Sequence, residues 1–144
     1  MNILEHLLPG LSGTSYEITS WCNSDYNCIA WAVGDGTEWW WPGRPDKSFW
    51  PAAVPRRETL EAFEALFTFL GFIPSADDVP EPGVEKVALF ANRHGLPTHA
   101  ARQLPNSRWT SKIGRAEDIE HDLHAIEGDL YGQVVRLFQR PARA

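Results

Sequence analysis

The sequence lacks basic runs and long apolar stretches. No run of basic residues is longer than Arg56-Arg57, and the net charge is −6. Because nucleic-acid binding depends on Lys and Arg clusters that release counterions, we expect no nucleic acid as partner. Apolar runs fall well short of the roughly 18 residues that a membrane helix needs, and the start of the chain lacks the pattern of a signal peptide. We expect a soluble, cytoplasmic protein with no membrane contact. Export by a route without a cleaved leader stays compatible with the sequence.

Cysteine is also scarce. The only two, Cys22 and Cys28, are six positions apart, which fits neither a CxxC redox pair nor a zinc-finger spacing. A disulfide that closes so short a loop would add little stability. We therefore expect two free thiols, no metal and no cofactor.

Hydrophobic and aromatic residues, in contrast, are plentiful. The 144 residues are 43% hydrophobic and include seven Trp and seven Phe, which is enough for one core without disulfides or metal. Repeats, low-complexity tracts and linker-like segments are absent. The sequence predicts a single domain over residues 1–144, with residues 1–20 as a loosely packed N-terminal extension.

Apolar spacing predicts three helices. The clearest covers residues 58–70, where apolar side chains recur at steps of three and four and Gly71 follows. A short helix is expected from Cys28 to Val33, after several residues that can cap a helix N-terminus. A third could form over residues 116–126.

Four later segments have the composition of strands: 85–92, 98–104, 108–113 and 131–138. A further extended segment is expected around residues 16–18. Helices that precede a run of strands predict an α+β fold, with the N-terminal helices packed on a mainly antiparallel sheet of four to five strands.

The chemistry that the sequence allows centres on Cys28. A thiol at a helix N-terminus would have a lowered pKa and gain nucleophilicity. His99, on a predicted strand, is the candidate base, and Ser111, on the next strand, is the candidate for orienting the imidazole. For each residue taken alone, an ordinary structural role is the alternative: a small buried hydrophobe for Cys28 and plain strand residues for the other two.

An aromatic loop follows the short helix. Trp39, Trp40 and Trp41 precede Pro42, in a segment too rich in Trp and Pro for regular structure. Clustered aromatics can form the wall of a substrate groove or simply brace a loop, and both interpretations stay open.

Five blocks of the sequence together resemble an uncharacterised bacterial family of the papain-like kind. The resemblance covers roughly residue 20 to the end, and more distantly the arrangement is similar to bacterial cell-wall endopeptidases and amidases. The blocks are Tyr26-Asn27-Cys28-Ile29-Ala30-Trp31-Ala32, Trp39-Trp40-Trp41-Pro42, Glu85-Lys86-Val87-Ala88-Leu89-Phe90-Ala91, Thr98-His99-Ala100-Ala101-Arg102-Gln103 and Trp109-Thr110-Ser111-Lys112-Ile113-Gly114.

The resemblance implies a papain-like fold in which Cys28 is the nucleophile and His99 the base. Ser111 would stand at the orienting position, with Asp118 or His121 as alternatives, and Asn23 would assist the oxyanion. The implied reaction is cleavage or transfer at an amide bond of a peptide, a peptidoglycan peptide or a protein side chain. The alternative is a non-catalytic protein-interaction domain that uses the Trp-rich loop, and the sequence does not determine the oligomeric state.

Overall fold

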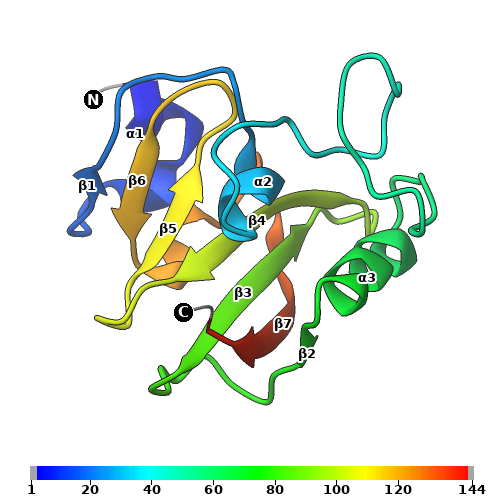
Figure 1. Cartoon of the computed structure of the whole chain (residues 1–144). Helices are drawn as coiled ribbons and strands as arrows, with labels where there is room; N and C mark the ends of the chain where they lie inside the picture. The colour runs from blue at the N-terminus through cyan, green and yellow to red at the C-terminus, as the bar shows by residue number, and fades with distance from the viewer. Residues whose placement is uncertain (1–2, 143–144) are drawn as a thin grey trace.

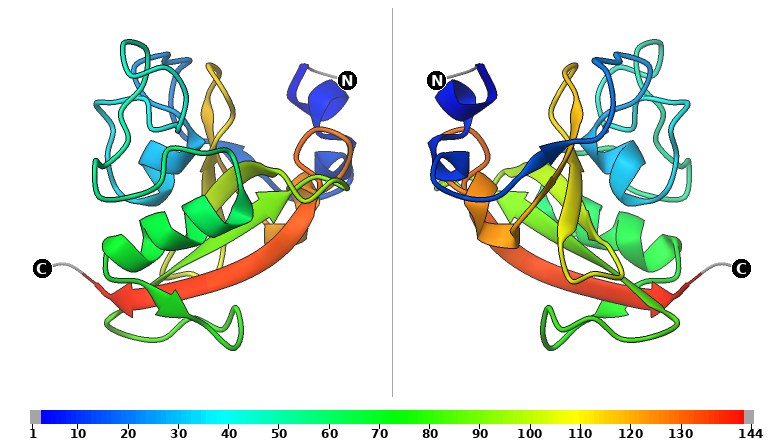
Figure 2. Two further views of the ribbon diagram at one scale, coloured as in Figure 1. Left: turned by 90° about the vertical axis from the view of Figure 1, so that its right-hand side faces the viewer. Right: turned by 90° about the vertical axis from the view of Figure 1, so that its left-hand side faces the viewer.

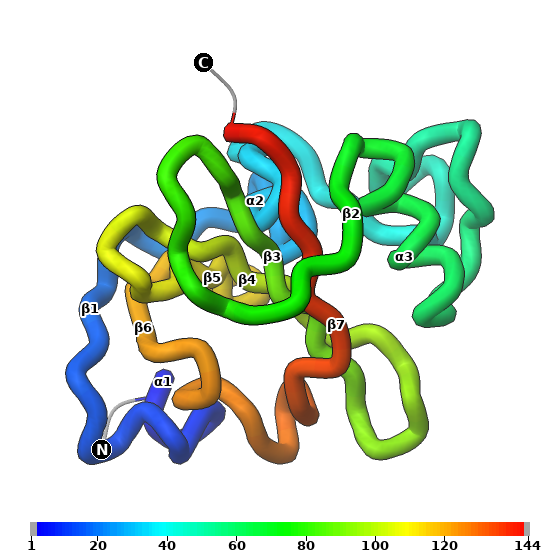
Figure 3. The backbone as a smooth tube through the Cα atoms, turned by 90° about the horizontal axis from the view of Figure 1, so that it is seen from below, coloured from blue at the N-terminus to red at the C-terminus, as the bar shows by residue number. Residues whose placement is uncertain are grey.

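The computed structural model describes residues 3–142 and contains one antiparallel sheet of seven strands (Figure 1). Their order across the sheet is β1-β6-β5-β4-β3-β7-β2, so the short strands β1 and β2 lie at its two ends (Figure 3). The strands are β1 (Glu17–Ile18), β2 (Ile73–Pro74), β3 (Val84–Ala91), β4 (Pro97–Gln103), β5 (Trp109–Lys112), β6 (Asp118–His121) and β7 (Gln133–Pro141).

Helices are few and short. They are α1 (Ile3–Leu7), α2 (Cys28–Ala32) and α3 (Leu60–Phe69), with the 3-10 turns η1 (Pro9–Leu11) and η2 (Leu123–Ile126). The α3 helix begins where the Thr59 side chain accepts a hydrogen bond from the Ala62 amide. It ends before Gly71, whose φ of 93° suits glycine.

The sheet separates two hydrophobic cores because neighbouring residues of a strand point to opposite faces. On one face, α2 and α3 pack with Val87, Leu89 and Ala100. On the other, α1, η1 and η2 pack with Ala88, Phe90 and Ala101. Figure 2 shows α1 on the side of the sheet away from α2 and α3.

The expected fold class is wrong. The chain forms mostly an antiparallel sheet with few short helices, and not an α+β papain-like arrangement on four to five strands. Strand β1 coincides with the extended segment expected around residues 16–18, whereas β2 contains two residues, too few to show an alternating pattern in the sequence.

The helix expected over residues 116–126 is also wrong. It forms β6 and η2, because β6 pairs with both β5 and β1. Asp118 and His121, at the ends of β6, are polar but buried, which hides the strand pattern. The four predicted strands 85–92, 98–104, 108–113 and 131–138 correspond to β3, β4, β5 and β7 within a few residues at each end.

Residues 3–20 are packed more tightly than expected. Leu4, Leu8 and Leu11 are all buried in the core that contains η2. Gly10 allows this contact, because a Cβ there would lie 2.4 Å from the carbonyl oxygen of Ala125. The described part of residues 1–20 is therefore not a loosely packed extension.

Two phenylalanines of α3 allow a matched test of the first core. Phe67 is fully buried and stacks on Phe138, whereas Phe69 is exposed. We expect Phe67→Ala to lower the free energy of unfolding by about 3–5 kcal/mol, because it leaves a cavity. Phe69→Ala is expected to change it by roughly 1 kcal/mol or less. Urea unfolding checks both, and equal losses would contradict the packing of α3 described above.

Candidate functional site

Cys28 is the first residue of α2, and the Asn27 side chain caps this helix. Asn27 Oδ1 accepts hydrogen bonds from the amides of Ala30 (3.2 Å) and Trp40 (2.9 Å), and its Nδ2 donates to the Trp40 carbonyl (2.6 Å). One buried amide side chain thus joins the start of the helix to the Trp-rich loop. Asn27 is one of the residues before Cys28 that can cap a helix N-terminus, whereas its bonds to the loop depend on tertiary structure.

Cys28 is only 8% exposed, and burial raises the pKa of its thiol to about 11. The nearby backbone amides of Ala100 and Ile29, and the charge of Lys112, oppose this rise without cancelling it. Burial therefore outweighs the expected lowering of the thiol pKa by the helix N-terminus. The helix α2 has only five residues, and the sulfur is buried away from solvent. At neutral pH the thiol is protonated.

His99 lies on β4 and is completely buried. Its ring stacks on Tyr131 with 4.0 Å between ring centroids and meets the edge of Phe90. These contacts belong to the core opposite α2, as the alternation along β4 requires, since Ala100 faces α2. The sequence does not indicate Tyr131 as a site residue, because its stacking on His99 joins β4 to the turn before β7, and no local pattern predicts such a contact.

A chain of hydrogen bonds runs from His99 through Ser111 to His121. His99 Nε2 lies 2.9 Å from Ser111 Oγ, and Ser111 Oγ lies 2.7 Å from His121 Nε2. His121 Nδ1 in turn lies 2.7 Å from the carbonyl oxygen of Asp122. The structure thus brings His99 and Ser111 together, while His121 contacts Ser111 and not His99.

This chain fixes the tautomer of both histidines. A carbonyl oxygen only accepts hydrogen bonds, so His121 must carry its proton on Nδ1 and accept from the Ser111 hydroxyl at Nε2. Ser111 Oγ then accepts a hydrogen bond from His99 Nε2–H. The remaining nitrogen, His99 Nδ1, is unprotonated, buried and without a hydrogen-bond partner among the described residues.

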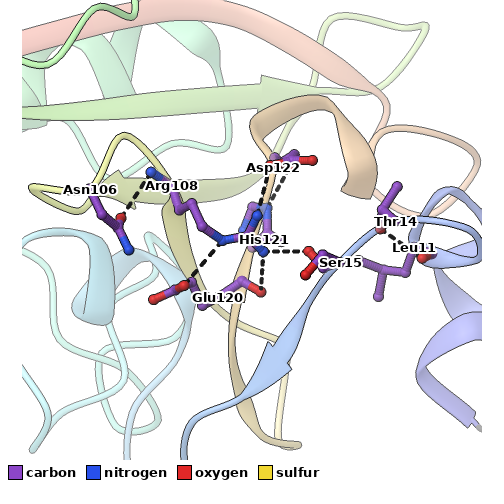
Figure 4. A network of polar contacts seen from close by, with 8 residues as sticks. All are labelled: Leu11, Thr14, Ser15, Asn106, Arg108, Glu120, His121 and Asp122. Atoms are coloured by element: carbon purple, nitrogen blue, oxygen red, sulfur yellow. Dashed lines mark hydrogen bonds and ion pairs between the residues drawn. The ribbon is translucent and has the colours of Figure 1, made fainter.

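Burial keeps both imidazoles neutral. It lowers the pKa of His99 well below its ordinary value, and the charge of His121 would lower it further. Burial also lowers the pKa of His121 to about 4, although the Asp122 carbonyl favours its protonation. The positive charge of Arg108 lowers the pKa of His121 further. Arg108 bonds Glu120, Asp122 and the Ser15 carbonyl, and so holds β5, β6 and the loop after η1 together around His121 (Figure 4).

Cys28 lies in the core on the α2 side of the sheet, whereas the His99 ring packs in the core on the opposite side, and His99 Nδ1 has no hydrogen-bond partner among the described residues. The Cys28 sulfur lies near the backbone amide of Ala100, the residue after His99. Pairing of β4 with β5 is confined to Arg102 and Gln103, so β5 leaves the edge of β4 free beside Ala100. The thiol occupies that part of the strand edge, on the α2 side.

The other predicted site residues lie on β6 and on the loops that flank α2. Asn23 Oδ1 accepts from the Asp25 amide within its own turn. Asp118 accepts a hydrogen bond from the Tyr26 hydroxyl at 2.7 Å and lies on the α2 face, away from Ser111. Trp40 donates to Asp35, and Trp39 and Trp41 line an open cleft.

The described residues hold no cluster of three or more His, Cys, Asp or Glu side chains suited to a metal ion. Within residues 3–142, no helix has the length and apolar character needed to cross a membrane.

The candidate site consists of a buried Cys at the start of α2 and a buried His and Ser on neighbouring strands of the antiparallel sheet. Residues 17–139 match a family described as a domain of unknown function (DUF7689), and the chain belongs to this family. No curated protein and no solved structure matches the chain.

The lowered pKa of His121 makes stability depend on pH. An unfolded histidine binds a proton below about pH 6.5, whereas folded His121 does so only near 4. Stability should therefore fall as the pH drops through this window, by about 3 kcal/mol from His121, with His99 acting in the same direction. Urea unfolding across this pH range measures the loss.

Two variants separate this effect from general acid denaturation. His121→Gln should show a smaller loss of stability between neutral pH and pH 4 than the unaltered protein. His94→Gln, at an exposed position, should keep the full loss. Identical pH dependence in all three proteins would contradict the neutral, buried state of His121.

Proposed function

We propose that this protein is a thiol hydrolase or acyltransferase that cleaves an amide bond, with Cys28 as nucleophile and His99 as base. The substrate would be a peptide, a peptidoglycan peptide or a protein side-chain amide. The observation that carries the proposal is the lone pair on His99 Nδ1, which has no partner among residues 3–142 and belongs to the residue next to Ala100, whose amide the Cys28 sulfur approaches. A buried nitrogen without a partner costs about 1–3 kcal/mol, and such costs are retained where they serve function.

The reaction would begin with transfer of the thiol proton to His99 Nδ1 as the Cys28 sulfur attacks the amide carbonyl. Collapse of the tetrahedral intermediate breaks the C–N bond, and His99 returns the proton to the leaving amine. A thioester on Cys28 remains. Water or an acceptor amine, deprotonated by His99, then attacks the thioester and regenerates the thiol.

A base is needed because so little thiolate exists in the resting protein. With a thiol pKa of about 11, on the order of one molecule in 10⁴ carries a thiolate at pH 7. His99, neutral above its lowered pKa, can accept the proton throughout the neutral range. Proton transfer would therefore accompany the attack, in contrast to enzymes that hold a stable thiolate–imidazolium pair.

Ser111 and His121 act as positioning residues in this proposal. Their hydrogen bonds hold the His99 proton on Nε2 and leave Nδ1 free to act as the base. His121 combines with Ser111 in the orienting role, for which the sequence offered them as alternatives. The proposal gives no oxyanion role to Asn23, whose side-chain oxygen is bound within its own turn.

The second candidate function is a non-catalytic protein-interaction domain that uses the Trp-rich loop. The observation in its favour is that Trp39 lines two open clefts, of about 400 and 350 Å³. In this alternative the Cys28 thiol is a buried apolar group, and the chemistry of His99 has no effect on it.

Alkylation of Cys28 distinguishes the two functions, with exposed Cys22 as an internal control. If His99 acts as base, the rate with iodoacetamide should be nearly constant between the pKa of His99 and that of the thiol. In His99→Gln the base is lost, and the rate should rise about tenfold per pH unit toward 11. At neutral pH the variant should be slower by about tenfold or more. Mass spectrometry of the two cysteine peptides gives both rates.

Cys22 should label equally fast in both proteins, and their thermal unfolding curves should show that His99→Gln is folded. If the alkylation rate of Cys28 depends on pH in the same way with and without His99, the base role is refuted. The interaction domain would then be the better function.

A further inference from the structure

A cleft of about 350 Å³ lies between the Trp-rich loop and the turn that joins β5 to β6. Two indoles, Trp39 and Trp41, and three basic side chains line it, and its lining includes no carboxylate. The basic residues are Arg44, Lys47 and Arg115. In a chain with a net charge of −6, such a concentration of positive charge is a local feature.

The basic side chains are not equally available. Arg44 forms an ion pair with Asp46 at 3.0 Å, so much of its charge is compensated. Arg115 lies 4.7 Å above the Trp39 ring, which holds the guanidinium against the wall of the cleft without neutralising it. Lys47 is exposed at the same opening. Arg115 and Lys47 are therefore the cations best suited to meet an anionic ligand.

Buried bonds hold the two walls of this cleft. Lys112 Nζ is completely buried and donates to the carbonyls of Gly114 and Ala116, on either side of Arg115. The Ala116 carbonyl also accepts from the Asn23 amide, five residues before Cys28. On the opposite wall, Asn27 binds the backbone of Trp40. The cleft is thus fixed to the segment that leads into Cys28.

We propose that this cleft binds a carboxylate on a peptide, either an acidic side chain or a free C-terminus. A guanidinium pairs with a carboxylate through two parallel hydrogen bonds, and the indoles offer flat apolar surface to the adjoining peptide. A single carboxylate responds mainly to the nearby cations, whereas a long polyanion would be repelled by the net charge of −6. As an assignment of substrate class, the inference rests on the proposed function. As a proposal of a binding site, it does not depend on the proposed function.

Titration of the full chain with short alanine peptides, followed by NMR of the indole N–H groups, tests the site. One peptide is blocked at both ends with a central glutamate, a second has glutamine instead, and a third has a free C-terminal carboxylate. The glutamate peptide, the free-carboxylate peptide or both should shift the Trp39 and Trp41 signals, and which of them binds identifies the source of the carboxylate. The glutamine peptide should not, and buried Trp109 should stay unmoved.

Charge variants assign the effect to the cleft. Arg115→Gln and Lys47→Gln should each weaken binding about threefold, and together about tenfold. Arg93→Gln, an exposed arginine that lines a different cleft, should leave binding unchanged. Equal shifts with glutamate and glutamine peptides, no effect of the double variant, or tighter binding of inorganic phosphate would overturn the proposal.

Cys28→Ala separates this test from that of the proposed function. The variant lacks the thiol but keeps every residue of the cleft, so peptide binding should persist. Loss of His99-dependent alkylation with binding intact would reject the catalytic role alone. Normal alkylation without carboxylate-dependent shifts would reject the cleft alone.

Discussion

The hydrogen bonds between β4, β5 and β6 hold His99, Ser111 and His121 on one face of the sheet. This arrangement requires the antiparallel register that pairs Ser111 with Ile119 and Gln103 with Trp109. Because side chains alternate along a strand, a shift of one residue would turn Ser111 to the other face and break both of its bonds. The histidine pair and its tautomers depend on this register.

The cost of burial determines the chemistry that this arrangement permits. Removed from water, the Cys28 thiol and both imidazoles stay neutral, so the resting protein holds no thiolate–imidazolium pair. The hydrogen bond from His121 to the Asp122 carbonyl sets the donor and acceptor of every hydrogen bond from His99 to Asp122, because a carbonyl oxygen can only accept. A proton acceptor is left at His99 Nδ1. The thiol approaches the same strand from its other side, at the amide of Ala100.

The candidate site and the basic cleft share supports near the start of α2. Asn27 fixes the Trp-rich loop, and Lys112 fixes the turn that carries Arg115. Both supporting side chains are buried and hydrogen-bonded, which makes these walls rigid where exposed loops alone would not be. A ligand held by the cleft would lie beside the segment that precedes Cys28, so binding and chemistry would use the same local framework.

The sequence by itself determined the long helix at 60–69, the strands β3, β4, β5 and β7, and the pairing of His99 with Ser111, because apolar periodicity and hairpin spacing are local signals. It did not predict β2 or β6, since a two-residue strand and a strand with buried polar ends carry no such pattern, and it placed β1 only as an extended segment around residues 16–18. Tertiary structure alone decided the raised pKa of Cys28, the stacking of Tyr131 on His99 and the bond of His121 to Ser111. Each of these depends on which distant residues remove a group from water or offer it a hydrogen bond.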